Sequence, residues 1–336
     1  MEALKLFNRV PFGDLAVPRF FLNVRPQQTI LLEEKGLTLK QSRRDFLKTG
    51  SAALIGGSAL LQSTKLYAQT LKLPLAIQLY SVRELLPTDF AGTLKKLGGL
   101  GYREVEAAGY YNHSAADVKK AIHDAGLNLV SAHYAANLLR TQLDEIIAYS
   151  KEVGVQYIVC SSPQRKNPTP GKPGMFTMDD WRWNAEQLNQ FGEKVNAAGL
   201  KFGYHNHYTE FHKTDGLVPY DELMRLTDPA KVAMEMDCGW VTIGGGDPVS
   251  YLKKYPTRIV MLHVKDFKKS SEPWSVTNRP KIAELGQGFI DYRPILAAAA
   301  KTGHIKHCFV EQEGFDMPPM ESLKVDADYM RKLGLF

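Results

Sequence analysis

Residues 232–264 read VAMEMDCGWVTIGGGDPVSYLKKYPTRIVMLHV, and this stretch decides the fold. It contains two apolar runs of strand character, 232–237 and 259–264, with a helix-like segment between them. Asp247 and Pro248 open that segment as a helix N-cap followed by proline at the first helical position. A strand, a helix and a second strand in this order form a right-handed βαβ unit with parallel strands. The stretch therefore predicts an α/β protein.

The same alternation extends from this unit in both directions along the chain. Strand-like runs lie at 75–80, 104–108, 127–133, 156–161, 201–205, 232–237, 259–264 and 306–311. Helix-like stretches between them lie at 90–100, 115–125, 138–153, 179–198, 220–226, 248–254 and 292–301. Eight strands with intervening helices predict a single (β/α)8 TIM barrel. A doubly wound open sheet would instead show a Gly-rich phosphate-binding turn after its first strand, and residues 80–84 contain no glycine.

An export signal precedes the predicted barrel. Residues 42–48 read SRRDFLK, a twin-arginine pattern, and residues 49–61 form a weakly apolar stretch rich in Gly, Ala and Ser. This stretch is too short to cross about 30 Å of hydrocarbon as a helix, so no stable membrane anchor is expected. Ala68 stands where a signal peptidase would cut. We therefore expect residues 1–68 to be an N-terminal extension with a signal peptide, and residues 69–336 to be the barrel. The partner in export is then the twin-arginine translocase, and the location is the periplasm.

The net charge argues against a nucleic-acid partner. The whole chain has a formal net charge of +6. Residues 1–68 hold ten of the 42 Lys and Arg residues but only five of the 36 Asp and Glu residues, so the predicted barrel keeps a net charge of +1. Proteins that bind nucleic acid usually have a basic patch on the functional domain. The expected partner is therefore a small molecule.

Four of the strand-like runs end in side chains that bind metal ions. They are residues 204–210 (YHNHYTE), 234–237 (MEMD), 261–263 (MLH) and 309–311 (FVE). The carboxyl ends of barrel strands open into one mouth, so Glu210, Asp237, His263 and Glu311 can meet there. Carboxylate oxygens with an imidazole suit a divalent cation. The sequence has no CxxC spacing that would indicate a thiolate zinc site.

Eight short motifs give the sequence a family resemblance from about residue 73 to the C-terminus. They are residues 77–83 (IQLYSVR), 101–106 (GYREVE), 131–133 (SAH), 204–207 (YHNH), 237–240 (DCGW), 263–266 (HVKD), 286–288 (GQG) and 310–311 (VE). With these motifs the chain resembles the sugar phosphate isomerase/epimerase family of xylose isomerase-like barrels, which includes ketose epimerases, hydroxypyruvate isomerases and inosose dehydratases. The resemblance implies a manganese, magnesium, cobalt or zinc ion held by Glu, Asp, His and Glu. Asp237, His263 and Glu311 match the last three of these ligands.

The first ligand departs from the family pattern. Many relatives have Glu-Asn-His at the fifth strand, where this chain has His205, Asn206 and His207. We expect the ligand carboxylate to have moved to Glu210, three residues beyond His207. Direct binding by His205 or His207 is the alternative.

A metal site of this kind supports removal of a proton next to a carbonyl. The cation acts as a Lewis acid on the carbonyl and a neighbouring hydroxyl, and stabilises the ene-diolate that forms. Return of the proton gives an epimer or an isomer, whereas loss of a β-substituent gives elimination. The sequence therefore predicts a metal-dependent sugar isomerase or epimerase. A lyase or dehydratase that acts on a keto-glycoside or an inosose is the first alternative, and a non-catalytic periplasmic sugar-binding protein is the second.

Individual residues of the predicted mouth can be assigned roles. Proton transfer is assigned to Glu311, Glu210, His207 and His133. Substrate contacts are assigned to His205, Lys265, Glu106 and Trp240. Lys265 lies on the same side of its strand as His263, and the face of Trp240 suits a sugar ring. Because the sequence shows no Gly-rich phosphate cradle, we expect a non-phosphorylated sugar or keto-sugar. Homo-oligomer formation is left open by the sequence.

Overall fold

The strands close into an eight-stranded parallel barrel. The computed structural model describes residues 71–168, 175–270, 278 and 280–334. The barrel strands are β1 (Ala76–Gln78), β2 (Glu104–Ala107), β3 (Asn128–Ala135), β4 (Tyr157–Ser162), β5 (Lys201–His205), β6 (Ala233–Asp237), β7 (Ile259–Val264) and β10 (His307–Val310). Their order around the barrel is β1-β10-β7-β6-β5-β4-β3-β2, so each strand pairs with its neighbour in the chain, and β1 and β10 close the ring. The predicted TIM barrel is confirmed.

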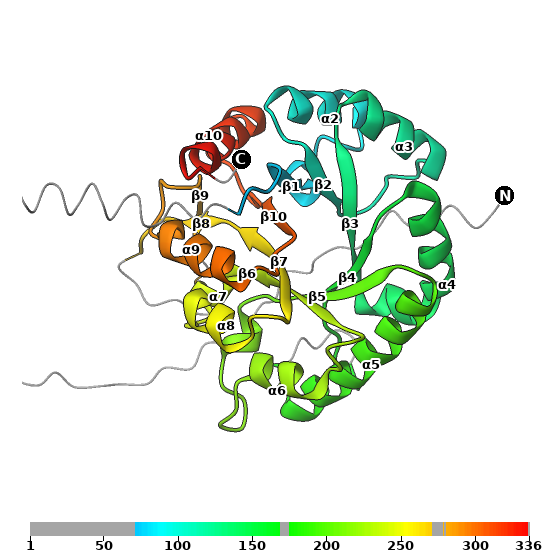
Figure 1. Ribbon diagram of the computed structural model, residues 1–336, viewed down its shortest axis with the longest axis vertical. Helices are drawn as coiled ribbons and strands as arrows, with labels where there is room; N and C mark the ends of the chain where they lie inside the picture. The colour runs from blue at the N-terminus through cyan, green and yellow to red at the C-terminus, as the bar shows by residue number, and fades with distance from the viewer. Residues whose placement is uncertain (1–70, 169–174, 271–277, 279, 335–336) are drawn as a thin grey trace, which may run out of the picture. The chain divides into compact units, whose positions relative to one another are not determined.

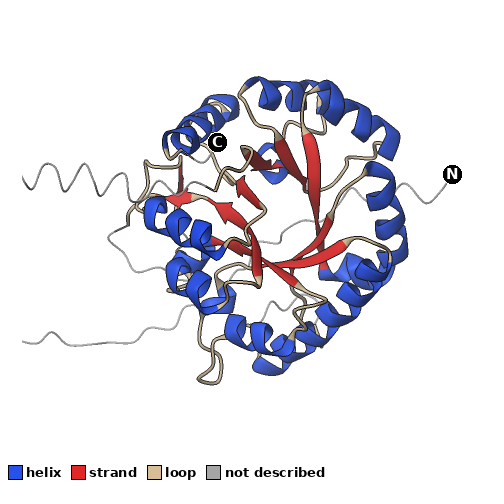
Figure 2. Ribbon diagram, in the orientation of Figure 1, coloured by secondary structure: helices blue, strands red, loops and turns tan. Residues whose placement is uncertain are grey.

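Helices form a ring around the strands, as Figures 1 and 2 show. They are α2 (Phe90–Gly99), α3 (Ala115–Asp124), α4 (Ala136–Val153), α5 (Met178–Ala197), α6 (Pro219–Leu226), α7 (Cys238–Ile243), α8 (Pro248–Lys254), α9 (Tyr292–Thr302) and α10 (Pro319–Lys332). Two short 3-10 turns, Leu79–Val82 and Thr209–Phe211, follow β1 and β5. The sequence pattern predicted every helix except α7 and α10.

Local chemistry fixes where several helices begin and end. Thr177 opens α5 with a capping box, in which its hydroxyl accepts the N–H of Asp180 while the carboxylate of Asp180 accepts the N–H of Thr177. Gly154 ends α4 at φ 92° and Gly303 ends α9 at φ 68°, both left-handed. Glycine adopts that conformation without a Cβ clash, and it allows the chain to turn sharply towards the next strand.

The barrel interior is apolar at its base and polar towards its mouth. The base is filled by Ala76, Val130, Tyr157, Val159, Met261 and Phe309, which form an apolar cluster separate from the one under the helices. Inward-facing residues recur every second position along a strand. The next inward layers above this base are therefore polar: His263 follows Met261, and Glu311 follows Phe309.

Asp266 ties a long connection back to the barrel. Two short strands, β8 (Asp266–Phe267) and β9 (Ile282–Ala283), pair as an antiparallel hairpin after β7. The carboxylate of Asp266 accepts four backbone N–H groups at 2.9–3.1 Å, from residues 267, 286, 288 and 290. A carboxylate that accepts several N–H groups is well satisfied when buried. The fully buried Asp266 thus holds both ends of the connection in place.

Residues 1–68 lie outside the described residues, so the signal peptide stays a prediction. Within the described part of the chain, no helix is both long and apolar enough to cross a membrane. Cys160, Cys238 and Cys308 all lie in that part, buried and unpaired.

Replacing Asp326 by Asn should stabilise the protein above neutral pH. Asp326 is fully buried in α10; its Oδ1 accepts the N–H of Leu285 at 2.7 Å, and burial raises its pKa to about 7. The pKa of Asp326 in the folded protein exceeds the unfolded value of about 3.9, so the folded state favours the neutral carboxyl group. The stability that this preference contributes is complete below pH 4 and is lost as the pH rises to 7. Asn has no charge to bury and keeps the acceptor, so the free energy of unfolding should rise by about 2–4 kcal/mol at pH 8.

Urea unfolding at pH 4 and pH 8 tests this expectation. The free energy of unfolding of Asp326→Asn should exceed that of the wild type only at pH 8. An equal increase at both pH values would show that the charge of Asp326 is not the cause. Asp328→Asn is the matched control, because Asp328 lies on the same helix but is exposed and paired with Lys324 and Arg331. It should show no gain at pH 8.

Candidate metal centre

Four strand ends bring four metal-binding side chains together at the barrel mouth. His205, Asp237, His263 and Glu311 are all buried, and one donor atom from each lies within 4.8 Å of the others. We name these four residues the mouth donor group. Their donors are two imidazole nitrogens and two carboxylate oxygens.

A second layer of polar side chains lies directly beneath the mouth donor group. It consists of Glu106, His133 and Glu235, and we name it the deep network. His133 Nε2 lies 2.9 Å from Glu106 Oε1 and 2.6 Å from Glu235 Oε2. Gln78 donates to Glu106 Oε1 at 2.8 Å, and the hydroxyl of Ser131 donates to its other oxygen. Both carboxylates are fully buried.

Strand register explains why the two layers meet. Glu235 pairs with His205 between β6 and β5, and Asp237 pairs with His263 between β6 and β7. Since residues two apart on a strand share a face, Glu235 lies one layer below Asp237. A register shift between Val105 and Glu106 places Ser131 opposite Glu106, where its hydroxyl completes the contacts of that carboxylate.

Lys265 provides the permanent positive charge of the mouth. Its ammonium lies 2.9 Å from Asp237 Oδ2 and 2.6 Å from Glu311 Oε2, and it also contacts Glu313 Oε1. The side chain is 1% exposed. Burial lowers the pKa of Lys265, but the three carboxylates outweigh burial and raise the pKa well above its ordinary value. The residue is therefore a fixed cation.

Two of the histidines have opposite charge states in the metal-free protein. Burial lowers the pKa of His205 well below its ordinary value, and the neighbouring His263 adds to the effect. For His133, burial also lowers the pKa, but Glu106 and Glu235 outweigh it and raise the pKa to about 9. At neutral pH His205 is therefore a neutral imidazole, the form that binds metal, while His133 is a cation between two carboxylates.

The residues of the mouth fit a divalent cation. Four carboxylates are buried in the two layers, at residues 106, 235, 237 and 311. Burial lowers the pKa of His263, but the surrounding carboxylates outweigh burial and raise it well above its ordinary value. A histidine must be neutral to bind a metal ion, and in that state of His263 the cations Lys265 and His133 balance two of the four negative charges. A divalent cation would balance the other two. Such a compensation is required because unbalanced buried carboxylates are costly. Two nitrogens and two oxygens suit zinc, cobalt or manganese, whereas magnesium prefers oxygen ligands alone.

The structure does not bring Glu210 into the mouth donor group. Its Oε1 accepts the hydroxyl of Tyr204 at 2.7 Å and the N–H of His207 at 2.9 Å, and its Oε2 accepts the hydroxyl of Thr209 at 2.7 Å. Glu210 is fully buried. Two groups of described residues could hold a metal ion, the mouth donor group and a second one made of His133, His205, Glu235 and His263, and Glu210 belongs to neither. Its role in proton transfer stays a prediction. The geometry argues against Glu210 as the first ligand. The reason is that the turn after β5 folds back and uses the carboxylate to fix its own backbone.

Replacing Glu210 by Gln tests this structural role. Gln cannot accept all three hydrogen bonds as strongly as a carboxylate, so the free energy of unfolding should fall by about 1–3 kcal/mol. The affinity for Zn2+ or Co2+ should stay within about threefold of the wild-type value, since the mouth donor group is intact. Urea unfolding and a metal titration measure the two effects. Loss of metal binding without loss of stability would restore Glu210 as a ligand.

The structure places the remaining predicted residues at two depths. His207 and Trp240 lie near the mouth, with ring centroids 6.2 Å apart, and His207 is half-buried. Trp240 packs against Lys265, whose ammonium is 5.0 Å from the ring centroid, and its Nε1 donates to Glu313. Glu106 is fully buried, and both of its oxygens have partners in Gln78, Ser131 and the imidazoles of His133 and His263. The side chain of His133 is 10% exposed, and its Nε2 lies between Glu106 and Glu235. The role of Glu106 as a contact for a substrate hydroxyl stays a prediction.

Two acidic residues of the site escaped the sequence analysis. Glu235 lies two positions before Asp237 on the same strand face, so the alternation of the strand could have indicated it. Glu313 lies two residues beyond Glu311, past the end of β10, where no strand periodicity applies. Contact with Lys265 and Trp240 shows that Glu313 belongs to the mouth.

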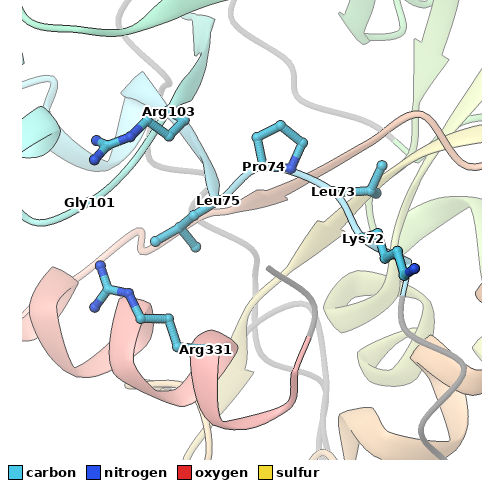
Figure 3. A pocket seen from close by; sticks show the side chains of 7 residues that line it. All are labelled: Lys72, Leu73, Pro74, Leu75, Gly101, Arg103 and Arg331. Carbon is cyan, nitrogen blue, oxygen red and sulfur yellow. The ribbon is translucent and has the colours of Figure 1, made fainter.

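A surface pocket at the opposite end of the barrel is unrelated to this site. Figure 3 shows its lining, which comes from the chain before β1, the chain before β2 and helix α10, and which includes Arg103 and Arg331. Both guanidinium groups donate to backbone carbonyl oxygens, of Gly98 and Tyr102 in one case and of Leu100 in the other. The amino-terminal face of a TIM barrel usually serves stability.

The model of the xylose isomerase-like TIM barrel family matches residues 94–333, most of the described chain. The chain belongs to this family. An inosose dehydratase from Geobacillus thermodenitrificans is 28% identical over 247 residues, which cover 67% of this chain and 82% of that protein.

Solved structures show the same fold in this family. A sugar phosphate isomerase/epimerase from Parabacteroides distasonis is 28% identical, with a TM-score of 0.64, and the match covers 77% of this chain and 97% of that chain. The IOLI protein, whose crystal structure contains a zinc atom, is 14% identical, with a TM-score of 0.62 over 78% of this chain and 98% of its own. At that identity the likeness extends to the fold alone.

Proposed function

We propose that this protein is a divalent-metal-dependent lyase or dehydratase that acts on a carbonyl-bearing polyhydroxylated ring, such as a keto-glycoside or an inosose. The mouth donor group, with Lys265 beside it, is the observation that carries the proposal. The similarity to inosose dehydratases supports elimination over simple proton return. The sequence pattern alone favoured isomerisation or epimerisation, with elimination as the alternative.

His205, Asp237, His263 and Glu311 would hold the cation. A cation bound there supplies Lewis-acid polarisation of the substrate carbonyl, which makes the adjacent C–H acidic. Lys265 contributes a fixed positive charge that attracts a substrate oxygen as negative charge develops on it. The buried apolar base of the barrel excludes water from beneath the site, which strengthens these interactions.

The proton transfer of this reaction is assigned to His207 and Glu311 at the mouth. His207 is half-buried beside Trp240, and Glu311 is the mouth carboxylate that contacts both His263 and Lys265. One of them takes the proton from the carbon next to the carbonyl. The electron pair forms a carbon–carbon double bond as the β carbon–oxygen bond breaks, and the departing oxygen accepts a proton to leave as water or an alcohol. The products are an unsaturated ketone and the leaving group.

Isomerisation or epimerisation is the second candidate, because the Parabacteroides distasonis structure is described as a sugar phosphate isomerase/epimerase at 28% identity. Both reactions begin with removal of the same proton. Their products differ, since epimers and isomers keep every substituent whereas elimination expels one.

Product analysis in heavy water tests the proposal. The protein loaded with Zn2+, Co2+ or Mn2+ is incubated with inososes, keto-glycosides, neutral sugars and sugar phosphates, and NMR follows the products. We expect an olefinic signal and a released substituent from an inosose or a keto-glycoside. Deuterium at the α-carbon with an intact skeleton would establish the isomerase. No exchange with any substrate, in a protein with bound metal, would indicate a sugar-binding protein, and activity confined to sugar phosphates would overturn the substrate class.

We also propose export through the twin-arginine translocase, on the pattern at residues 42–48. Replacing both Arg43 and Arg44 by Lys should leave the uncut precursor in the cytoplasm, because this route requires the arginine pair. Cell fractionation with antibody detection measures the distribution. Unchanged secretion of the doubly substituted protein would contradict the proposal.

A further inference from the structure

His205 belongs to the mouth donor group, and Glu235 lies directly behind it. The two residues are paired across β5 and β6, and His205 Nδ1 lies 3.0 Å from Glu235 Oε2. Their side chains are 2% and 0% exposed. The end of β5 therefore places in the mouth an imidazole with a buried carboxylate behind it.

The second nitrogen of His205 faces the mouth. Nε2 lies 3.8 Å from Asp237 Oδ2, a separation that fits two ligands of one metal ion rather than a hydrogen bond. When Nδ1 donates its proton to Glu235, the lone pair of the neutral imidazole is on Nε2, directed at the mouth. The contact with Glu235 thus selects the tautomer that can bind a cation.

His263 repeats the arrangement with its nitrogens exchanged. Its Nε2 lies 2.8 Å from Glu106 Oε1, while its Nδ1 lies 3.0 Å from Glu311 Oε2 in the mouth. Both histidines of the mouth donor group therefore have one nitrogen on a deep carboxylate and the other among the mouth carboxylates. A carboxylate behind a metal-binding histidine fixes the ring and raises its basicity.

We propose that Glu235 and His205 act as one metal-binding unit. His205 binds the cation through Nε2, and Glu235 is a positioning residue that fixes the ring and places a negative charge behind the neutral imidazole. This inference rests on the proposed function, in which a divalent cation binds the mouth donor group. It extends that function by defining the first ligand and the kind of metal.

The negative charge of Glu235 is directed at the surrounding imidazoles. Its Oε1 is buried and has no hydrogen-bond partner among the described residues, so no backbone N–H shares the charge. The imidazoles of His133, His205 and His263 are the groups that its Oε2 contacts, at 2.6, 3.0 and 3.4 Å. The resulting ligand set of two nitrogens and two oxygens favours Zn2+ or Co2+ over Mg2+.

A double-mutant cycle on Co2+ binding tests the unit. In Glu235→Gln the affinity for Co2+ should fall about 10–100-fold, and the visible absorption of bound Co2+ should shift, because the ring of His205 is no longer fixed by a charged acceptor. In a His205→Glu background the ligand has its own charge. There the further change Glu235→Gln should cost less than about threefold, so the two effects are strongly non-additive.

The chain offers a matched control for a buried carboxylate next to an imidazole. Glu104 and His307 form such a pair, 2.7 Å apart, at the amino-terminal end of the barrel. Glu104→Gln removes the same charge from a similar environment away from the mouth, so it should leave Co2+ affinity and absorption unchanged. Thermal unfolding of each metal-free variant shows whether it is folded.

Several results would overturn the inference. Wild-type Co2+ affinity and absorption in a folded Glu235→Gln variant would show that Glu235 does not position the ligand, and so would an equal loss in both backgrounds. Binding of two Co2+ ions by the wild-type protein, one of them lost with Glu235→Gln, would make Glu235 a ligand itself. Absence of bound Co2+ from the wild-type protein, or its full retention in Asp237→Asn, would instead overturn the proposed function.

Discussion

Replacing Asp237 by Asn should remove the bound metal and the activity while leaving the barrel folded. Asp237 supplies a charged oxygen to the mouth donor group, and loss of a ligand charge should lower metal affinity by more than about 100-fold, the upper range for positioning residues behind ligands. Turnover should fall by about 10²–10³, because the developing charge on the substrate loses several kcal/mol of stabilisation. The Oδ1 of Asn can still accept the N–H of Trp240, now accepted by Asp237 at 2.8 Å, so the start of α7 is preserved.

Metal analysis, a Co2+ titration and the elimination assay measure these effects together. Asp247→Asn is the matched control, since Asp247 caps α8 in the same way by accepting the N–H groups of Val249 and Ser250. That variant should keep its metal and its turnover. A stoichiometric ion in Asp237→Asn, bound as tightly as in the wild type, would contradict the assignment of the centre.

Replacing Lys265 by Met should destabilise the metal-free protein by about 3–5 kcal/mol, the usual cost of removing one partner from a buried ion pair. Lys265 is the fixed cation between Asp237, Glu311 and Glu313, and without it these carboxylates would repel one another in a site of low polarity. Zn2+ should restore part of the lost stability, because it binds the folded state and neutralises two of the same groups.

Urea unfolding without Zn2+ measures the loss of stability in Lys265→Met, and urea unfolding with Zn2+ measures how much of it the metal restores. Lys254→Met serves as the comparison, since Lys254 pairs with Asp221 at 2.8 Å on the surface and its loss should cost less than about 1 kcal/mol. If the metal-free Lys265→Met protein were as stable as the wild type, the mouth carboxylates would have to be neutralised by protons instead.

The barrel was predictable because its signals are local and repeated. Most strands contain an apolar run, and most helices have a side-chain cap or a glycine terminus, such as Thr177 or Gly154. Helix α7 was missed because it begins immediately after β6, with Asp237 as both strand end and N-cap. The helix α10 follows the last strand, where no further strand marks its end.

The site was predictable only to the extent that strand ends converge. Asp237, His263 and Glu311 end their strands facing inward, and the structure brings them together. Glu210 could not be judged this way, because it follows β5 in a 3-10 turn whose direction depends on its own hydrogen bonds. The deep network depends on strand register and on a bulge beside Glu106, and neither is visible in a single sequence.

The connection after β7 is anchored independently of the residues in its middle. Because the carboxylate of Asp266 and the pairing of β8 with β9 hold both ends, the residues between the two short strands do not determine the position of Lys265 or His263. The chain between Phe267 and Ile282 could therefore change in length or in sequence while Lys265 and His263 keep their positions.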